Sequence, residues 1–381
     1  MSNILRSAGA FVLGSIFTSV ALASPAMDAA FSLPAWSDTC AIPSATESSP
    51  VMHDSAFQLA SDDEPAAPEE KHESCTGCNQ GSCGTGCNEC SQYNCCRMPK
   101  CYASAGVVIL HRSRPDSGTV VGNNPFTGTT FSNASDFRFG WDAGPDVTIG
   151  YRYDCCDAIE GRFFEDDGAS DDNSFRTPGG FIGAGFTGPA NTLFDGRYTT
   201  QLYSSELNWR HSLNDQLDVL TGFRWIELKD DMNYRINTTV AEGDYRYRNH
   251  LYGAQMGLDW KLTDRCSPLQ INAVGKAGLY GNQADGGSYP SAPVGSPISG
   301  NTFTGVDTTA AFVGELDFTA TYRLSCHCAV HGGYELLWLN DVALAGDAAS
   351  RSLQAPVLLR TVDNGQNLFY NGATTGIDFT W

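Results

Sequence analysis

The chain has 381 residues, 41% of them hydrophobic and 11% aromatic, and its mean hydropathy is -0.24. Its formal net charge of -20 argues against nucleic acid or an anionic surface as the main partner. These values suit a soluble protein and a membrane barrel equally well, because only alternate residues of a barrel strand face lipid.

Residues 1–23 have the pattern of an export signal. Arg6 supplies a positive start, Ala8 to Leu22 form a short apolar run, and Ala21-Leu22-Ala23 is a small-x-small cleavage site before Ser24. The run is too short for a good membrane span, and no later stretch has the apolar length of a transmembrane helix. If the exported protein enters a membrane, we expect it to do so with strands.

Residues 24–74 form an acidic segment with many Pro, Ser and Ala residues, which predicts a disordered linker. Residues 75–101 form a Cys-rich segment. The spacing Cys75-x-x-Cys78 with Cys87-x-x-Cys90 is compatible with a four-thiolate zinc site, whereas export to an oxidising compartment favours disulfides. We predict disulfides here, and neither a cofactor nor a metal. The eight candidates are Cys75, Cys78, Cys83, Cys87, Cys90, Cys95, Cys96 and Cys101.

From residue 102 onward, apolar and polar residues alternate as in strands with one oily face. Examples are 146–153, 252–262 and 312–324. The last five residues, Ile377 to Trp381, continue the alternation and finish on an aromatic ring, as in a barrel whose final strand closes the sheet.

The predicted connections alternate between short and long. Short turns are expected at 154–157, 213–216, 263–268 and 325–328, and long loops near 111–144, 167–200, 229–250, 282–308 and 340–367. This asymmetry predicts an all-β fold: a single antiparallel transmembrane β-barrel over residues 102–381, with about ten strands and a range of eight to twelve. Short turns are periplasmic in outer-membrane barrels, so both termini are expected in the periplasm.

Aromatic residues on the oily faces gather near the strand ends, which favours a barrel with two interfacial girdles over a soluble sandwich. The girdle expected near the short turns contains Tyr151, Tyr153, Trp209, Trp260, Tyr322 and Trp381. The other contains Trp225, Trp338 and Phe369.

Several short segments occur in a distinctive order and spacing. They include Tyr102-Ala103-Ser104-Ala105, Gly150-Tyr151-Arg152, Gly222-Phe223-Arg224, Gly275-Lys276-Ala277-Gly278 and Gly333-Tyr334-Glu335-Leu336-Leu337-Trp338-Leu339. In this order and spacing they resemble the planctomycete outer-membrane β-barrel (porin-like) family. The resemblance covers about residues 102–381 and implies an outer-membrane location, but no particular activity.

Five further cysteines fall in the predicted short turns, on the side where the Cys-rich segment enters the first strand. We therefore hypothesise that residues 75–101 form a periplasmic cap cross-linked to these turns. The alternatives are local pairing of the turn cysteines and links to neighbouring envelope or cell-wall proteins. The five candidates are Cys155, Cys156, Cys266, Cys326 and Cys328.

The polar faces of the strands carry charges of both signs, which we expect to line the lumen. Because a ten-stranded barrel is only slightly wider than one that its side chains just fill, a filled, salt-bridged core is favoured over an ion-selective channel. The lumen candidates are Arg152, Glu160, Arg162, Glu206, Arg210, Arg224, Asp259, Lys261, Lys276, Glu315, Asp317, Arg323 and Glu335, together with Asp146 and Asp378.

The sequence gives no support for an enzyme. It lacks a nucleophile motif, and His331 with Glu335 is better explained by a hydrogen bond in the lumen than by acid–base catalysis. We expect a porin-like protein in contact with outer-membrane lipid, with a structural role or limited passive passage of small solutes. The alternatives are a sealed barrel that anchors the envelope through its Cys-rich segment and, with less support, an outer-membrane enzyme. The oligomeric state does not follow from the sequence.

Overall fold

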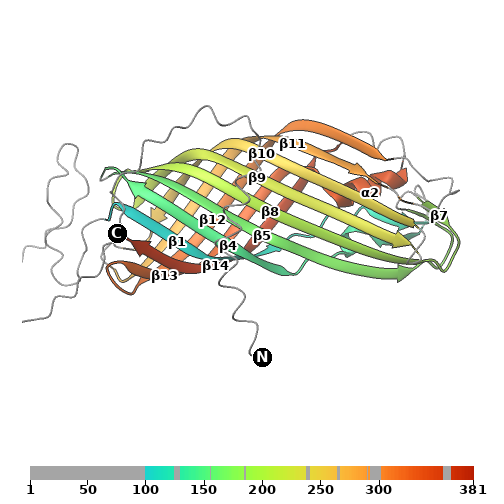
Figure 1. Cartoon of the computed structure of the whole chain (residues 1–381), viewed down its shortest axis with the longest axis horizontal. Coiled ribbons are helices and arrows are strands. Elements are labelled where there is room, and N and C mark those ends of the chain that lie inside the picture. The colour runs from blue at the N-terminus through green and yellow to red at the C-terminus, as the bar shows by residue number, and fades with distance from the viewer. Residues whose placement is uncertain are drawn as a thin grey trace, which may run out of the picture. The chain divides into compact units, whose positions relative to one another are not determined.

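A computed structural model describes residues 99–123, 129–154, 156–183, 186–236, 241–263, 267–289, 291, 302–354 and 362–381. Ten antiparallel strands in this part of the chain form one closed barrel, which confirms the predicted fold and strand number (Figure 1). The order around the barrel is β1-β14-β13-β12-β11-β10-β9-β8-β5-β4. The strands are β1 Cys101–Arg112, β4 Trp141–Arg152, β5 Asp157–Arg176, β8 Leu193–Ser212, β9 Leu217–Ile236, β10 Ala241–Lys261, β11 Leu269–Ser288, β12 Phe303–Arg323, β13 Cys328–Val342 and β14 Gln366–Thr380.

The barrel closes where β1 pairs with β14. Tyr102 lies opposite Thr380, and the register continues to Arg112 opposite Tyr370. At the end of this seam the Cys101 amide donates to the Trp381 carbonyl at 3.0 Å, and the Trp381 amide donates to the Cys101 carbonyl at 2.9 Å. Pairing at the seam therefore extends to the last residue, and neither β1 nor β14 presents an open edge.

The strands are longer than the sequence predicted. β5, β8, β9 and β11 have 20 residues each and β10 and β12 have 21, about twice the 9–11 residues that a membrane requires. The expected loops at 167–200 and 229–250 are thus largely strand. The reason is that alternation continues beyond the membrane length: Met232, Tyr234, Tyr245 and Tyr247 are all buried.

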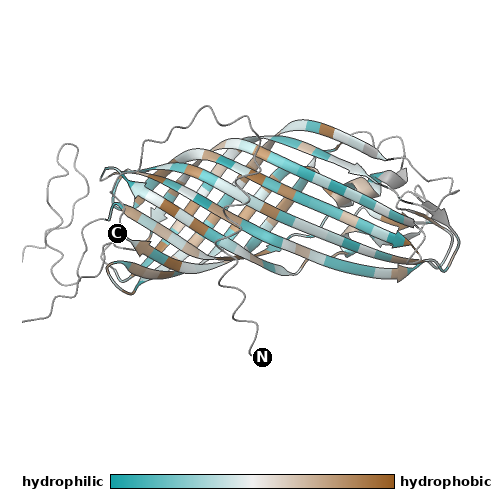
Figure 2. Ribbon diagram, viewed as in Figure 1, coloured by the Kyte–Doolittle hydropathy of each residue, from teal (hydrophilic) through white to brown (hydrophobic). Residues whose placement is uncertain are grey.

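Hydrophobic residues recur along the strands in the half of the barrel nearer the C-terminus (Figure 2). Large apolar side chains are exposed there, including Leu279 at 74% and Met256 at 69%. Exposed rings occur near the short turns, at Tyr153, Trp209, Trp260 and Tyr322, and again further along the strands, at Trp338 and Phe369. The outer surface of the other half of the long strands is mainly polar, which places the lipid-facing band in the first half.

Leu279→Arg is expected to destabilise the barrel in lipid vesicles by up to about 2–4 kcal/mol, because Leu279 is 74% exposed on the apolar outer face and the substitution places a cation there. Val306→Arg is the matched control, since Val306 is also exposed (64%) but lies six residues further from the short turns, opposite Asp285. We expect it to cost about 0–1 kcal/mol. The measurement is the urea midpoint of each variant; equal midpoints would contradict this position of the band.

Short elements between the barrel strands form a structure that we call the cap. It comprises β2 Thr119–Gly122, β3 Thr130–Asn133, η2 Ala134–Asp136, β6 Phe181–Gly183, β7 Phe186–Gly188 and α2 Ala345–Gln354. β3, β2, β6 and β7 make a small sheet. In Figure 1, α2 and β7 lie at the end of the barrel opposite the C-terminus. The cap shares one buried apolar cluster with the upper parts of the barrel strands, including Val121, Phe137, Phe194 and Ala349.

None of the helices in the described ranges is long and apolar enough to cross a membrane.

Candidate functional site

The central feature of the barrel interior is a network of charges around Glu315 on β12. Its carboxylate contacts Arg162 Nη1 from β5 at 3.2 Å, Lys276 Nζ from β11 at 2.7 Å, and Arg224 from β9. Since β5 and β9 are not neighbours of β12 in the sheet, these contacts must cross the interior. Glu315 therefore ties together opposite walls of the barrel.

Further carboxylates complete this central network. Arg162 Nη2 also contacts Asp146 at 2.9 Å and Glu335 at 2.7 Å, while Lys276 Nζ contacts Glu206 at 2.7 Å. Every one of these side chains is at most 15% exposed. At this depth, removing one partner costs far more than at the surface, because the remaining charge loses its compensation.

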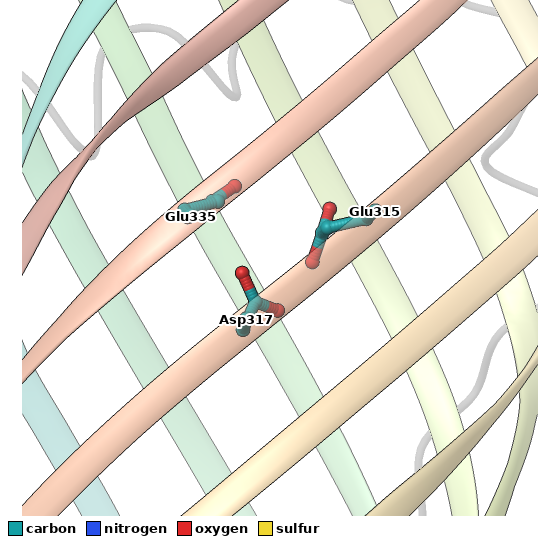
Figure 3. Close-up of side chains that lie close together, drawn as sticks. All are labelled: Glu315, Asp317 and Glu335. Carbon is teal, nitrogen blue, oxygen red and sulfur yellow. The ribbon is translucent and has the colours of Figure 1, made fainter.

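Three of the acids lie side by side on neighbouring strands. Figure 3 shows Glu315 and Asp317 on β12 and Glu335 on β13, and their carboxylates come within 4.8 Å of one another. Oxygen ligands at this spacing are the type that hard cations prefer. However, Arg162 already binds two of the three, so the protein supplies its own positive charge at this position.

A second group of charges lies nearer the short turns. Arg210 Nη1 contacts Glu160 Oε2 at 2.9 Å, and its other terminal nitrogen contacts Asp259. The Tyr102 hydroxyl donates to Glu160 at 2.8 Å. The Tyr102 ring lies against Gly150, where an added Cβ would be 2.0 Å from the ring. A glycine is therefore required at 150 for Tyr102 to pass over β4 and reach Glu160 on β5.

Lys261 belongs to the same group, and its Nζ contacts Asp218 at 2.8 Å. Arg152 places its guanidinium over the Tyr102 ring, 5.2 Å from the centroid. Charged and aromatic side chains thus occupy the lumen on the turn side of the central network as well.

An apolar layer closes the interior on the other side of the central network. Its side chains are buried and form one cluster, and all of them except Leu344, which follows β13, come from nine of the ten barrel strands, every one but β4. Among the described residues, packed side chains from so many strands leave little room for water at this level. The layer consists of Val108, Leu110, Phe164, Leu202, Ile226, Leu228, Leu251, Tyr280, Ala311, Val313, Leu337, Leu339, Val342, Leu344, Leu368 and Tyr370.

Above this layer, Asp230 on β9 holds the cap to the barrel. It is fully buried, pairs with Arg112 of β1, accepts from the Tyr198 hydroxyl at 2.6 Å and accepts from the Ala345 amide at 2.8 Å. Two more bonds, from Asn249 Nδ2 to the Ala343 carbonyl at 2.8 Å and from the Ala343 amide to Asn249 at 2.7 Å, hold the segment that leads into α2.

Within α2 itself, Asp347 pairs with Arg351 at 2.7 Å, one turn along the helix. Burial raises the pKa of Asp347 above its ordinary value, and the positive charge of Arg351 opposes this shift. Asp347 lies in the first turn of the helix and Arg351 in the last, so each charge also interacts favourably with the helix dipole.

The lumen candidates occupy three kinds of position. Arg323 is exposed at the end of β12, because it lies beyond the level at which opposite strands contact each other. Half-buried candidates are Asp146, Arg152, Arg162, Arg210, Lys261, Asp317 and Asp378. Buried candidates are Glu160, Glu206, Arg224, Asp259, Lys276, Glu315 and Glu335.

The expected hydrogen bond between His331 and Glu335 is wrong. His331 Nδ1 contacts Asp378 on the adjacent strand β14 at 2.9 Å, whereas Glu335 is held by Arg162. Residues that sequence reasoning missed include Asp218, Arg112 and Asp230. For Asp230 the signal was present, since it continues the inward series Arg224, Ile226 and Leu228 of the same strand.

Only some of the candidate cysteines lie in the described part of the chain. Cys101 and Cys326 each take part in a disulfide. Cys156 lies half-buried in the turn after β4. Cys328 is a free cysteine, so the disulfide expected there is not formed; its nearest cysteine in sequence, Cys326, is already bonded. The predicted signal and linker lie outside the described residues, as does most of the Cys-rich segment 75–101 that was expected to cover the periplasmic mouth. The cysteines outside the described residues are Cys75, Cys78, Cys83, Cys87, Cys90, Cys95, Cys96, Cys155 and Cys266.

Comparison with solved structures finds distant bacterial barrels. The outer membrane protease OmpT from Escherichia coli has 10% sequence identity and a TM-score of 0.39, with 74% of this chain and 97% of that chain covered. The translocator domain of the autotransporter NalP from Neisseria meningitidis has 9% identity and a TM-score of 0.38, with 76% and 91% covered. These similarities are too distant to carry an argument about function.

Comparison with curated protein sequences gives no match. A family model described as "Putative beta barrel porin-7 (BBP7)" matches residues 186–362, from β7 through the loop after α2. The match covers much of the closed barrel and its exposed apolar band. The chain is thus a closed ten-stranded antiparallel β-barrel that is similar, over residues 186–362, to a family of putative β-barrel porins.

Proposed function

We propose that this protein is a sealed barrel with a structural role in the envelope, and that its Cys-rich segment, residues 75–101, attaches it to envelope or cell-wall proteins. The observation that carries the proposal is the filled interior: charged pairs cross the lumen around Glu315, and the apolar layer closes the level above it. No catalytic role forms part of this proposal.

The proposed orientation puts the short turns and both termini in the periplasm and the cap outside the cell. The short turns lie beside the exposed rings of Tyr153, Trp209 and Trp260, as periplasmic turns do in outer-membrane barrels. The long strands then carry the cap well above the membrane surface. In this orientation residues 75–101 are on the periplasmic side, where disulfide links to other proteins can form.

The refolded mature protein is expected to give no stepwise current in planar bilayers, since the packed side chains of the apolar layer leave little room for water. Insertion is checked first by heat-modifiable migration on gels and by a strand-rich circular dichroism spectrum. A general porin incorporated into the same kind of bilayer is the positive control, because it shows that stepwise currents can be detected. Reproducible conductance steps from the folded protein would instead show an open channel, with Arg162, Arg224 and Lys276 as selectivity candidates.

A further inference from the structure

A pocket of about 590 Å³ lies at the cap end of the molecule, away from the charge network of the lumen. Its volume is in the range of small-ligand sites, about 300–1,000 Å³. The lining comes from three parts of the chain: the segment after β1, the segment from β3 to Arg138 just beyond η2, and the distal part of β5. The lining residues are Arg114, Phe131, Ser135, Asp136, Arg138, Asn173 and Phe175.

Two arginines give the pocket its charge. Arg114 and Arg138 are both exposed, and the guanidinium of neither one forms an ion pair or hydrogen bond within the described residues. This is unusual in a chain with a net charge of -20, where cations have an excess of acids available. Each guanidinium offers a planar fork of N–H donors that matches carboxylate, sulfate or phosphate.

Two phenylalanines give the pocket an apolar surface. Phe131 and Phe175 are partly buried and pack against the apolar cluster of the cap. The Phe175 ring stacks on Phe194 with centroids 5.2 Å apart and planes 3° from parallel. Packing therefore holds the Phe175 ring on one side, and the exposed parts of both phenylalanines can contact the C–H face of a ligand.

The remaining lining residues suit hydroxyl groups. Ser135 and Asn173 provide a hydroxyl and an amide, which both donate and accept. Asp136 accepts from the Asn133 amide at 2.8 Å through Oδ2, which leaves its other oxygen available as an acceptor. The Arg138 amide donates to Asp171 at 2.7 Å, so the segment that carries Arg138 is fastened to β5 before any ligand binds.

We propose that this pocket binds a free anionic mono- or disaccharide. The arginines pair with its acidic group, the phenylalanines cover its C–H face, and Ser135, Asn173 and Asp136 bind its hydroxyls. A neutral sugar would leave the two arginines without a partner. An aromatic acid would lack the hydroxyls that the polar lining recognises.

The test is isothermal titration calorimetry of the full refolded chain in detergent with D-glucuronate, D-glucose and benzoate. Glucuronate is expected to bind at least about tenfold more tightly than either of the others, and more weakly as salt increases. The double variant Arg114→Gln/Arg138→Gln should weaken glucuronate binding by about tenfold or more. Asn173→Asp, which changes one atom and adds a negative charge, should also weaken it.

Arg248→Gln is the control, because Arg248 is an exposed arginine on β10 that does not line the pocket. The affinity of Arg248→Gln for glucuronate should equal that of the wild type. The melting temperature of every variant should equal that of the wild type. The proposal is overturned if glucuronate does not bind, if glucose or benzoate binds equally well, or if folded Arg114→Gln/Arg138→Gln retains wild-type affinity.

Discussion

Glu315→Leu is expected to destabilise the barrel by about 3–5 kcal/mol, the cost of breaking a buried ion pair by removing one partner. The substitution leaves Arg162, Arg224 and Lys276 without the carboxylate that they share, in an interior where Glu315 is almost fully buried. Arg162 and Lys276 keep other acidic partners, but Arg224 has no other ion pair among the described residues. The measurement is the urea midpoint in lipid vesicles.

The control for this effect is Glu242→Gln. Glu242 pairs with Arg235 at 2.7 Å, but the side chains are 42% and 54% exposed, and surface pairs contribute about 0–1 kcal/mol. If Glu315→Leu and Glu242→Gln shifted the midpoint equally, the lumen network would have no special role in stability. A large shift for Glu315→Leu alone would show that the network braces the barrel across its interior.

Asp230→Asn is expected to release the cap from the barrel. Asparagine keeps the shape of the side chain but removes the charge that compensates buried Arg112, and it weakens the bonds from the Tyr198 hydroxyl and the Ala345 amide. The expected cost is again about 3–5 kcal/mol. Limited proteolysis should cut near residues 345–354 much faster than in the wild type, while the barrel strands stay protected.

The adjacent residue provides a closely matched control for this prediction. Asp231 is the next residue on β9, and because side chains alternate, it points to the opposite face of the sheet, where it is only half-buried. The control Asp231→Asn makes the same chemical change one position away. Rapid cleavage of both variants would show that loss of charge on β9, and not loss of the Asp230 contacts, exposes the cap.

The fold was predictable because period-two alternation marks each strand separately. Tyr252 to Leu262 and Phe312 to Leu324 showed their outward faces without reference to any neighbour. Strand ends were less predictable. Residues 229–250, which were expected to form a loop, contain many polar side chains, yet they extend strands β9 and β10 as a paired hairpin. The buried side chains of this hairpin, Met232, Tyr234 and Tyr245, pack in the apolar cluster of the cap rather than against lipid.

The inward face of each strand was also visible in the sequence, but its contacts were not. Glu315 meets Arg162 and Arg224 only because the radius and stagger of the closed barrel bring β5, β9 and β12 to one level. Neither quantity can be read from one strand. The cap was missed for a similar reason. The Ala345 amide at the start of α2 donates to Asp230, and these two residues are 115 positions apart in the sequence.

The pairing of β1 with β14 determines when the barrel can complete its folding. All other barrel neighbours are consecutive strands or are separated by one cap excursion, whereas the seam joins Cys101 to Trp381. Joining the ends of so long a segment carries the largest loop-closure entropy in the sheet, so this step is expected to come last. Until then β1 and β14 are unpaired edges, and a chaperone that shields sheet edges would be needed for as long as the seam stays open.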